Sequence, residues 1–326
     1  MKVLFVGPYP PPHGGISVHV WSAHTLMKQA GLQSNVLNVN PRAPESDAYI
    51  KISGGFTLIR ELIRHVWNDW ALNVHTNGHN RKSWALALAC GIAAQFGQDA
   101  TVTLHSGLAP AYIRNGSDRR RRIIRLACEL YRQIICVNEE IAATVAELGI
   151  PKDRIHIVPA FLPVEVPTPA MPPTVESWLQ KHSPILAATM FFRPEYGFEL
   201  LMRAVAQLRH RYPGLGCVVM GGDEAPELAQ AFVAVNRLGD VVLLAGDVDH
   251  ELCLALMARS TVFVRPTLKD GDSISVREAV TLGVPVVASN VGTRPQGVLL
   301  FEPGDVDGLV NQLERAVEGV NEPKPM

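Results

Sequence analysis

The chain has 326 residues, of which 47% are hydrophobic and 19% are charged. This length exceeds what one compact core usually serves and predicts two domains, while the composition excludes a mainly disordered protein. The formal net charge of −1 provides no general attraction for nucleic acid. We therefore expect no DNA or RNA partner, and any anionic ligand must be held by local groups.

The five cysteines are scattered, without the CxxC spacing of a metal site, and we expect them to be reduced, mostly buried thiols. The apolar run Lys2–Val6 is too short for the core of a signal peptide. No later apolar run reaches the roughly 20 residues that span a bilayer. These features predict a soluble, cytoplasmic protein.

Short apolar or β-branched runs alternate with longer helical patterns, which favours parallel sheets built from βαβ units. In the first half the pattern predicts strands over 2–6, 33–39, 71–76, 100–105, 133–138 and 155–158. It predicts helices over 16–30, 56–70, 83–97, 118–131 and 139–148. These elements make one complete Rossmann-like domain, to which we assign residues 1–165.

Prolines cluster between Pro159 and Pro184. Because each fixes φ and removes a backbone donor, we expect little regular structure there and place a linker over 166–183. The second half predicts strands over 184–190, 215–220, 241–245, 261–265 and 284–288, and helices over 197–211, 226–237, 249–258, 274–283 and 305–318.

The second set of elements predicts another Rossmann-like domain over 184–304, followed by a C-terminal helix and tail over 305–326. The predicted fold class is therefore α/β, with two parallel sheets facing an inter-domain cleft. Ligands of such sheets bind outside the carboxyl ends of the strands, so the loops after the strands are the expected site.

The loop after the first predicted strand contains Gly14 and Gly15, directly before the first helix. Glycines let the backbone pass close to a ligand, and a helix N-terminus presents unpaired N–H groups to an anion. We predict that both glycines bind substrate, either a pyrophosphate or an acceptor group. The alternative is a Pro-rich turn with glycines for steric reasons, and the absence of GxGxxG disfavours a dinucleotide oxidoreductase.

The most informative stretch, Phe263–Ser289, reads as a strand, a polar loop, a helix and a second strand. Ser273 is a candidate N-cap, so the amides at this helix start can bind a diphosphate. These amides belong to Gly271, Asp272, Ser273 and Ile274. The carboxylates of Asp270 and Glu278 would repel phosphate, and they suit the hydroxyls of a sugar and a ribose instead.

Other interpretations of these acids remain. Glu278 is also explained as an acid favoured by the helix dipole, and Asp270 as a turn residue before glycine. Asp270-Gly271-Asp272 matches a DxD element, whose carboxylates would bind Mg²⁺ or Mn²⁺. Since the helix-start amides already supply positive potential, we expect no required metal and no other cofactor.

This stretch resembles the signature of family 4 (group 1) retaining glycosyltransferases, in which two acids are separated by seven residues. Asp270 and Glu278 have that spacing, with Asp in place of the usual first Glu. The resemblance extends to the Gly14-Gly15 loop and to the strand Pro285–Ser289. It implies a GT-B fold, in which Asp270 contacts the donor sugar, Glu278 holds the ribose diol and the Gly271–Ile274 amides receive the phosphates.

His105 ends a predicted strand, and its family counterpart contacts the donor sugar or the acceptor near the reacting carbon. A neutral imidazole exchanges protons near pH 7 or hydrogen-bonds sugar hydroxyls. The alternative is a histidine packed at a strand end. With this alternative open, His105 joins Asp270 and Glu278 as a predicted catalytic residue.

Family members usually carry an Arg and, five residues later, a Lys before the glycine that aligns with Gly197. This chain has Phe191 and Tyr196 at those positions. In relatives the two cations neutralise the leaving diphosphate. We predict that Arg193, displaced by two residues, and Arg265, at the end of a strand, replace them.

The resemblance implies transfer of a sugar from a UDP- or GDP-type donor to a hydroxyl acceptor, with retention, in bacterial surface polysaccharide or glycolipid assembly. Because the usual cations are missing, an impaired protein that binds sugar nucleotide or a partner subunit is an alternative, as is a GT-B nucleotide-sugar epimerase. Family acceptors are often lipid-linked. The basic run Arg119–Arg122, with Trp67 and Trp70, is either a solvated helix face or a peripheral contact with the inner face of the membrane.

Overall fold

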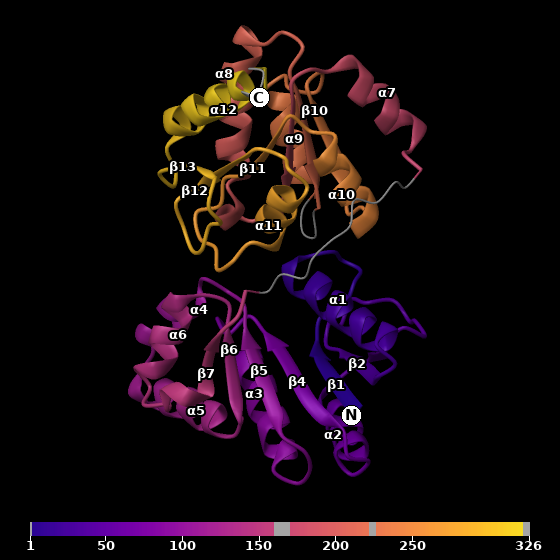
Figure 1. Ribbon diagram of the computed structural model, residues 1–326, viewed down its shortest axis with the longest axis vertical. Coiled ribbons are helices and arrows are strands. Elements are labelled where there is room, and N and C mark those ends of the chain that lie inside the picture. Colours follow the sequence, from indigo (N-terminus) through magenta and orange to yellow (C-terminus); the bar gives the residue numbers. More distant parts are fainter. Residues whose placement is uncertain (1, 160–169, 222–225, 322–326) are drawn as a thin grey trace. The chain divides into compact units, whose positions relative to one another are not determined.

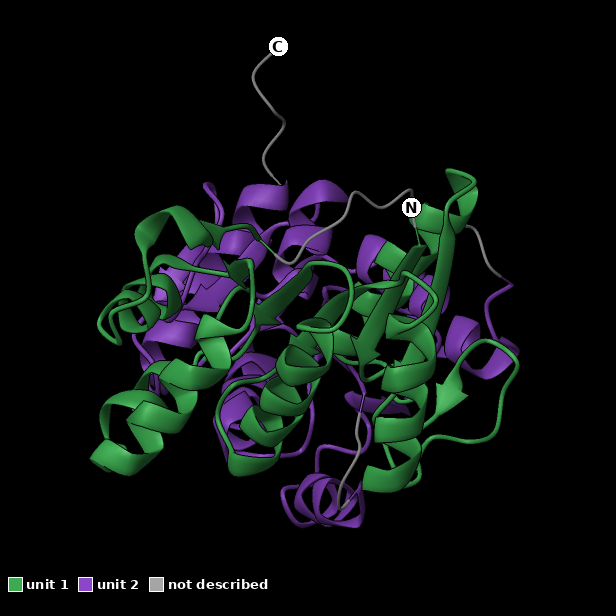
Figure 2. Ribbon diagram, turned by 90° about the horizontal axis from the view of Figure 1, so that it is seen from below, with its two compact units in different colours: residues 1–162, 270–272 green, residues 163–269, 273–326 purple. Residues whose placement is uncertain are grey.

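The computed structural model describes residues 2–159, 170–221 and 226–321. The chain divides into two compact units, residues 1–162 with 270–272, and residues 163–269 with 273–326 (Figure 2). Each unit contains one sheet, and the strand pairs within both sheets are parallel.

The first unit is built on a seven-stranded sheet in the order β3-β2-β1-β4-β5-β6-β7 (Figure 1). Its strands are β1 (Lys2–Gly7), β2 (Gln33–Asn38), β3 (Ile50–Lys51), β4 (Ala71–Thr76), β5 (Ala100–Leu104), β6 (Gln133–Cys136) and β7 (Ile155–Ile157). Its helices are α1 (Gly15–Gln29), α2 (Gly55–Val66), α3 (Arg81–Ala94), α4 (Ala109–Arg114), α5 (Asp118–Glu129), α6 (Glu139–Ala146) and η1 (Lys152–Arg154). The strand order reverses between β1 and β4, where parallel sheets commonly bind ligands.

The second unit is built on a six-stranded sheet in the order β10-β9-β8-β11-β12-β13. Its strands are β8 (Ile185–Thr189), β9 (Gly216–Met220), β10 (Val242–Gly246), β11 (Val262–Arg265), β12 (Val286–Ser289) and β13 (Leu299–Phe301). Its helices are α7 (Pro173–Lys181), η2 (Pro194–Tyr196), α8 (Phe198–Arg211), α9 (Pro226–Val235), α10 (His250–Ala258), α11 (Ile274–Thr281) and α12 (Val306–Asn321). Here the order reverses between β8 and β11.

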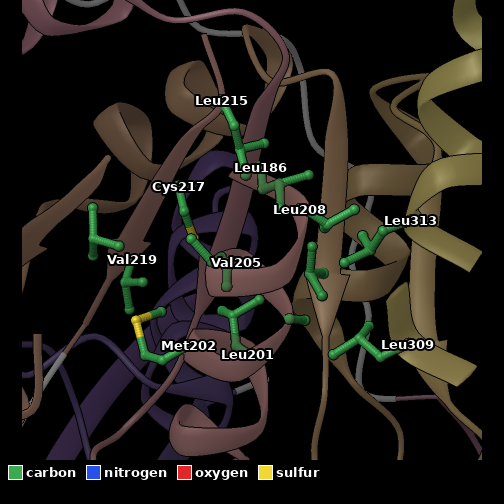
Figure 3. Packing of buried hydrophobic residues seen from close by; sticks show 14 of the residues in the cluster. Leu186, Leu201, Met202, Val205, Leu208, Leu215, Cys217, Val219, Leu309 and Leu313 are labelled. Atoms are coloured by element: carbon green, nitrogen blue, oxygen red, sulfur yellow. The ribbon is translucent and has the colours of Figure 1, made fainter. Parts of the chain in front are cut away.

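The strands of the second sheet are apolar because both of its faces are covered. Leu186 and Ala188 of β8 pack into one core, with α8 and α12, whereas Ile185 and Ala187 pack into another. Figure 3 shows the first of these cores, in which Leu186 lies next to Leu208 of α8, and Leu309 and Leu313 come from α12. Alternate residues of a strand point to opposite faces, so a continuous apolar run fills two cores at once.

The predicted strands and helices are all present, with ends that differ by a few residues. The largest difference is at α2, predicted to reach residue 70 but ending at Val66. Asp69 has a φ of 64°, in the left-handed region that a helix cannot continue through. The apolar pattern therefore runs past the point where the backbone turns away.

The expectation of little regular structure between Pro159 and Pro184 is wrong for Pro173–Lys181, which forms α7. Proline is tolerated in the first helical turn, where its missing N–H has no partner to lose. Leu179 is buried in the second unit's core, and Trp178 packs against it. The prolines thus start a helix that core packing stabilises, whereas residues 160–169 lie outside the described part of the chain. The short elements β3, α4, β13, η1 and η2 were also not predicted.

The cysteines agree with the expectation of unpaired thiols. All five are free, and four of them are buried. Burial raises the pKa of Cys90 and of Cys217 to about 12. These groups are protonated, unreactive parts of the cores.

Candidate functional site

The polar loop, residues 266–273, leads from β11 into α11. Ser273 is the N-cap of α11, as predicted, and its Oγ accepts a hydrogen bond from the Val276 N–H at 3.4 Å. The first N–H groups of a helix have no acceptor within the helix and carry the positive end of its dipole. The start of α11, with Ile274 as its first residue, is therefore suited to an anion.

One amide of the predicted phosphate site is already engaged. The Gly271 N–H donates to Oδ1 of Asp270 at 3.0 Å. A phosphate at this amide would have to displace the carboxylate, which would then be available to a sugar hydroxyl. Gly271 and Asp270 thus act as a pair, whereas Ser273 and Ile274 belong to the helix start itself.

Glu278 lies in α11 and is held by a residue that the sequence pattern did not indicate. Its side chain is buried, and Nε2 of His250 lies 2.6 Å from its Oε1. His250 is the first residue of α10, after the N-cap Asp249. A buried carboxylate requires hydrogen-bond donors, and the imidazole supplies one while fixing the orientation of the acid. The two residues are far apart in sequence and meet only because α10 packs on α11.

Arg193 and Arg265 lie on an aromatic pair. Phe191 and Tyr196, which stand where relatives usually have cations, meet edge-to-face with ring centroids 5.4 Å apart. The Arg193 guanidinium lies 5.1 Å from the Phe191 ring, and that of Arg265 lies 5.1 Å from the Tyr196 ring. Arg265 also donates from Nη1 to the Thr189 carbonyl at 2.9 Å. The aromatic rings thus orient two cations through cation–π contacts at the carboxyl ends of β8 and β11.

A third cation at this edge of the sheet, Arg294, was not predicted. Its Nε donates to the carbonyl of Ser289 at 3.1 Å, and its Nη2 donates to Oγ1 of Thr267 at 3.2 Å. Ser289 ends β12, and Thr267 belongs to the polar loop. Arg294 therefore connects that loop to the neighbouring strand. It lies in a loop outside any motif, and only the fold brings it here.

The first unit gathers three histidines at the carboxyl edge of its sheet. His19 lies on α1, His75 on β4 and His105 directly after β5, with ring centroids 5.2 to 5.5 Å apart. Nδ1 of His75 and Nε2 of His105 are hydrogen-bonded at 3.0 Å. His75 is buried and His105 is half-buried, so His105 is the accessible end of the pair.

Both hydrogen-bonded histidines are neutral at pH 7. Burial first, and then the neighbouring His19, lowers the pKa of His75 well below 6.5. Burial, followed by His75 and His19, lowers the pKa of His105 in the same way. In a neutral pair, one ring donates the shared proton and the other accepts it. The pair is therefore suited to hydrogen bonding with a hydroxyl.

We expect the free energy of unfolding to fall as the pH is lowered through about 6.5. Below that value His75 is protonated in the unfolded chain but not in the folded chain, so the free energy of unfolding falls by up to about 1.4 kcal/mol per pH unit. Above that value His75 is neutral in both states, and it makes no contribution to the pH dependence. Urea unfolding at about pH 5.5 and about pH 7.5 measures this effect. His75→Gln should flatten the dependence, and the exposed His156→Gln should not. If the free energy of unfolding of both variants depended on pH as that of the wild type does, His75 would not be the source of the effect.

Gly14 and Gly15 begin α1, which follows β1 at the same edge of the first sheet. Gly14 is the N-cap, with φ −143° and ψ 163°, a conformation open to any residue. Its N–H donates to Oγ of Ser17 at 2.9 Å. The backbone angles therefore do not require a glycine at position 14. A tighter restriction exists at Gly7, where an added Cβ would lie 3.1 Å from Cβ of His75.

The structure thus gathers the predicted residues in two groups, each at the carboxyl edge of one sheet. The first contains Gly14, Gly15 and His105, and the second contains Arg193, Arg265, Ser273, Ile274 and Glu278. Asp270, Gly271 and Asp272 lie in the polar loop between β11 and α11. Sequence reasoning missed His250, which contacts Glu278, and Arg294, which contacts the polar loop.

Two Rossmann-like units, each built on a parallel sheet, define the GT-B fold class. The crystal structure of Anabaena HepE in complex with UDP-glucose has this fold. It matches with a TM-score of 0.71 over 98% of this chain and 91% of that chain, at 15% sequence identity. A similarity at this identity shows the shared fold.

Sequence profiles that match each half of the chain identify its family. The profile of Glycosyltransferase Family 4 matches residues 13–166, and that of Glycosyl transferases group 1 matches residues 183–319. The chain belongs to glycosyltransferase family 4, the glycosyl transferases group 1.

Curated relatives are distant. The chain is 23% identical to a phosphatidylinositol N-acetylglucosaminyltransferase subunit of Arabidopsis thaliana, over 82% of this chain and 58% of the relative. It is 27% identical to the MMP alpha-(1->4)-mannosyltransferase of Mycolicibacterium hassiacum, over 63% of this chain and 49% of the relative. The chain therefore spans about half the length of these curated relatives.

Proposed function

We propose that this protein transfers a sugar from a nucleoside diphosphate, of the UDP or GDP type, to a hydroxyl acceptor with retention at the anomeric carbon. The observation that carries the proposal is the buried Glu278 carboxylate, held by His250 beside the capped start of α11. It combines an acceptor for hydroxyl groups with a site for phosphate, which is what a sugar nucleotide presents. Family membership supports the same reaction.

The proposed roles follow the geometry of each unit. Glu278 accepts hydrogen bonds from the ribose hydroxyls, and the amides from Gly271 to Ile274 hold the diphosphate. Asp270 turns from the Gly271 N–H to the donor sugar. Arg193 and Arg265 balance the charge of the leaving diphosphate, a role worth several kcal/mol at a transition state.

The first unit is proposed to bind the acceptor. Gly14 and Gly15 at the start of α1 approach an acceptor group, and the neutral His105 exchanges hydrogen bonds near the reacting carbon. We assign no enzymic nucleophile. Retention then requires that the leaving phosphate itself helps to deprotonate the acceptor hydroxyl, on the face from which it departs.

We also propose that the acceptor is lipid-linked and that the reaction serves bacterial surface polysaccharide or glycolipid assembly on the cytoplasmic side of the membrane. Support comes from relatives such as the phosphatidylinositol N-acetylglucosaminyltransferase of Arabidopsis. Anabaena HepE with bound UDP-glucose supports a nucleotide-sugar donor.

Incubation with a panel of UDP and GDP sugars, each together with a lipid-linked hydroxyl acceptor, tests the reaction. We expect release of one nucleoside diphosphate with a glycoside formed in the donor's anomeric configuration, measured by NMR. Binding without hydrolysis or transfer would instead identify an impaired binding protein, the alternative raised by Phe191 and Tyr196. Free epimerised sugar nucleotide without any acceptor would identify an epimerase.

Metal removal should not change the rate of transfer. The start of α11 and the cations Arg193 and Arg265 provide positive potential for the diphosphate, so no divalent ion is required. The transfer rate with excess EDTA should equal that with added Mg²⁺ or Mn²⁺. Activity that EDTA abolishes and Mn²⁺ restores would make Asp270 and Asp272 metal ligands instead.

His250→Leu should weaken binding of a nucleoside diphosphate by about five- to tenfold, the equivalent of one hydrogen bond of about 1 kcal/mol. The lost affinity should come from contacts with the ribose hydroxyls, because His250 orients the Glu278 carboxylate that binds them. Titration calorimetry would compare a nucleoside diphosphate with its 2′-deoxy form, which should bind the variant and the wild type nearly equally. The exposed His210→Leu serves as the control. An equal loss for both ligands would mean general damage rather than lost orientation.

A further inference from the structure

Within the described parts of the chain, no helix is long and apolar enough to cross a membrane. The first unit nevertheless exposes an apolar row on α2. Phe56 is 82% exposed, Ile59 55% and Ile63 42%, and Trp67, at the C-cap, is 77% exposed. Their spacing of three and four residues places them on one side of the helix. This side points away from the core, which α2 contacts through other residues, including Leu62 and Val66.

The neighbouring helices extend this surface. On α3 and just beyond it, Ile92 is 49% and Phe96 75% exposed, and on α5 Ile123 is 42% and Leu126 51% exposed. The central helix α3 contacts both α2 and α5, and Figure 1 shows it between them. Exposed large apolar side chains scattered singly are ordinary, but eight on three adjacent helices mark an interaction surface. We refer to the exposed residues of α2, α3, α5 and the segments just after them as the outer helix surface.

These helices carry a large excess of positive charge. The three helices carry nine Lys or Arg residues and three Asp or Glu residues, in a chain whose net charge is −1. Of the three acids, Glu61 is buried and pairs with Arg60, and Glu129 pairs with Arg125. The outer helix surface is therefore both apolar and positive.

We propose that the outer helix surface docks on a bilayer of anionic phospholipid. Apolar side chains at the headgroup boundary gain hydrophobic energy, Trp67 suits the interface, and arginines beside them attract lipid phosphates. A second copy of the chain would bring two positive surfaces together, which charge repulsion disfavours. Nucleic acid would match the arginines but would leave the apolar row of α2 unused.

Docking of the first unit on a bilayer does not depend on the transfer reaction. Sugar-nucleotide binding could fail while vesicle binding succeeds, and the reverse. If the proposed lipid-linked acceptor is correct, docking through this surface would also concentrate the enzyme where that acceptor lies.

Flotation with vesicles tests the proposal with the full-length protein. We expect the wild type to float with vesicles of phosphatidylcholine mixed with phosphatidylglycerol and to remain unbound with phosphatidylcholine alone. Binding should weaken as salt is raised, because screening reduces the attraction of the arginines. Fluorescence emission of Trp67 should shift to the blue on binding, and Trp67→Phe should remove most of that shift.

Two double variants separate the apolar and electrostatic contributions. Ile59→Ser with Trp67→Ser, and Arg119→Glu with Arg122→Glu, should each lower the partition onto anionic vesicles about tenfold or more. Because all four side chains are exposed, folding should be preserved, which circular dichroism checks.

The matched control is Leu228→Ser with Val235→Ser on α9, where both side chains are also highly exposed. This variant should bind vesicles like the wild type. Wild-type protein that ignores anionic vesicles would overturn the proposal, as would an apolar variant that binds them equally well. A wild-type dimer that Ile59→Ser with Trp67→Ser converts to monomer would assign the surface to a second copy instead.

Discussion

Glu278→Gln should weaken the binding of UDP or GDP about 100-fold, as measured by titration calorimetry. The carboxylate accepts charge-assisted hydrogen bonds from the ribose hydroxyls, and each such bond contributes about 1.5 to 3 kcal/mol. Glutamine keeps the size of the side chain and one acceptor oxygen for His250, but it places an amide donor against a hydroxyl. The fold should therefore persist while the affinity is lost.

Glu251→Gln is the matched control, since Glu251 is an exposed acid in the first turn of α10. Its affinity for UDP and GDP should equal that of the wild type. If Glu278→Gln bound nucleotide as tightly as this control, Glu278 would be only a buried structural acid, and the ribose would have to be held elsewhere.

Arg265→Ala should lower kcat by about 10² to 10³, the second large effect. Its guanidinium is fixed by the Thr189 carbonyl and the Tyr196 ring, so it is oriented before charge develops on the leaving diphosphate. Arg193→Ala should lower both kcat and donor affinity, by a smaller factor. Steady-state kinetics with the donor identified by the sugar-nucleotide panel would measure both.

Arg203→Ala, an exposed arginine on α8, controls for the loss of a positive charge. It should leave kcat and KM unchanged. Unaltered donor affinity in Arg193→Ala would remove that residue from the phosphate site. Full activity in both Arg193→Ala and Arg265→Ala would show that Phe191 and Tyr196 have no cationic substitutes at these positions, and Arg294 would become the next candidate.

The fold followed from periodicity to a large extent because many strands are short apolar runs, and those of the second sheet, such as β8, fill two cores. The errors occurred where backbone geometry or tertiary packing overrides local pattern. The apolar pattern of α2 continues to Trp70, but the left-handed conformation of Asp69 ends the helix earlier. The prolines before Lys181 suggested a loop, yet packing of Leu179 stabilises α7.

The sequence predicted residues of the candidate site only where they lie close together in the chain. The polar loop and α11 form one segment, so the N-cap Ser273 and the spacing of Asp270 and Glu278 were readable as a motif. His250 lies on another helix and reaches Glu278 only through the packing of α10 on α11. A contact of this kind leaves no periodic or spacing signal in a single sequence.

Surface features show the same limit. The sequence suggested a basic patch at Arg119–Arg122 near Trp67 and Trp70 as one alternative, but it did not separate the outward row of α2 from an ordinary core-facing pattern. Both rows are apolar at helical spacing. The two rows can be told apart only by which of them is buried, and burial depends on the fold.

A crystal structure of the protein soaked with UDP and GDP sugars would show directly where the nucleotide binds. We expect one nucleotide to bind with its ribose hydroxyls on the Glu278 carboxylate, its diphosphate on the amides at the start of α11, and Asp270 turned away from the Gly271 N–H. A nucleotide bound elsewhere, or with its ribose away from Glu278, would contradict it.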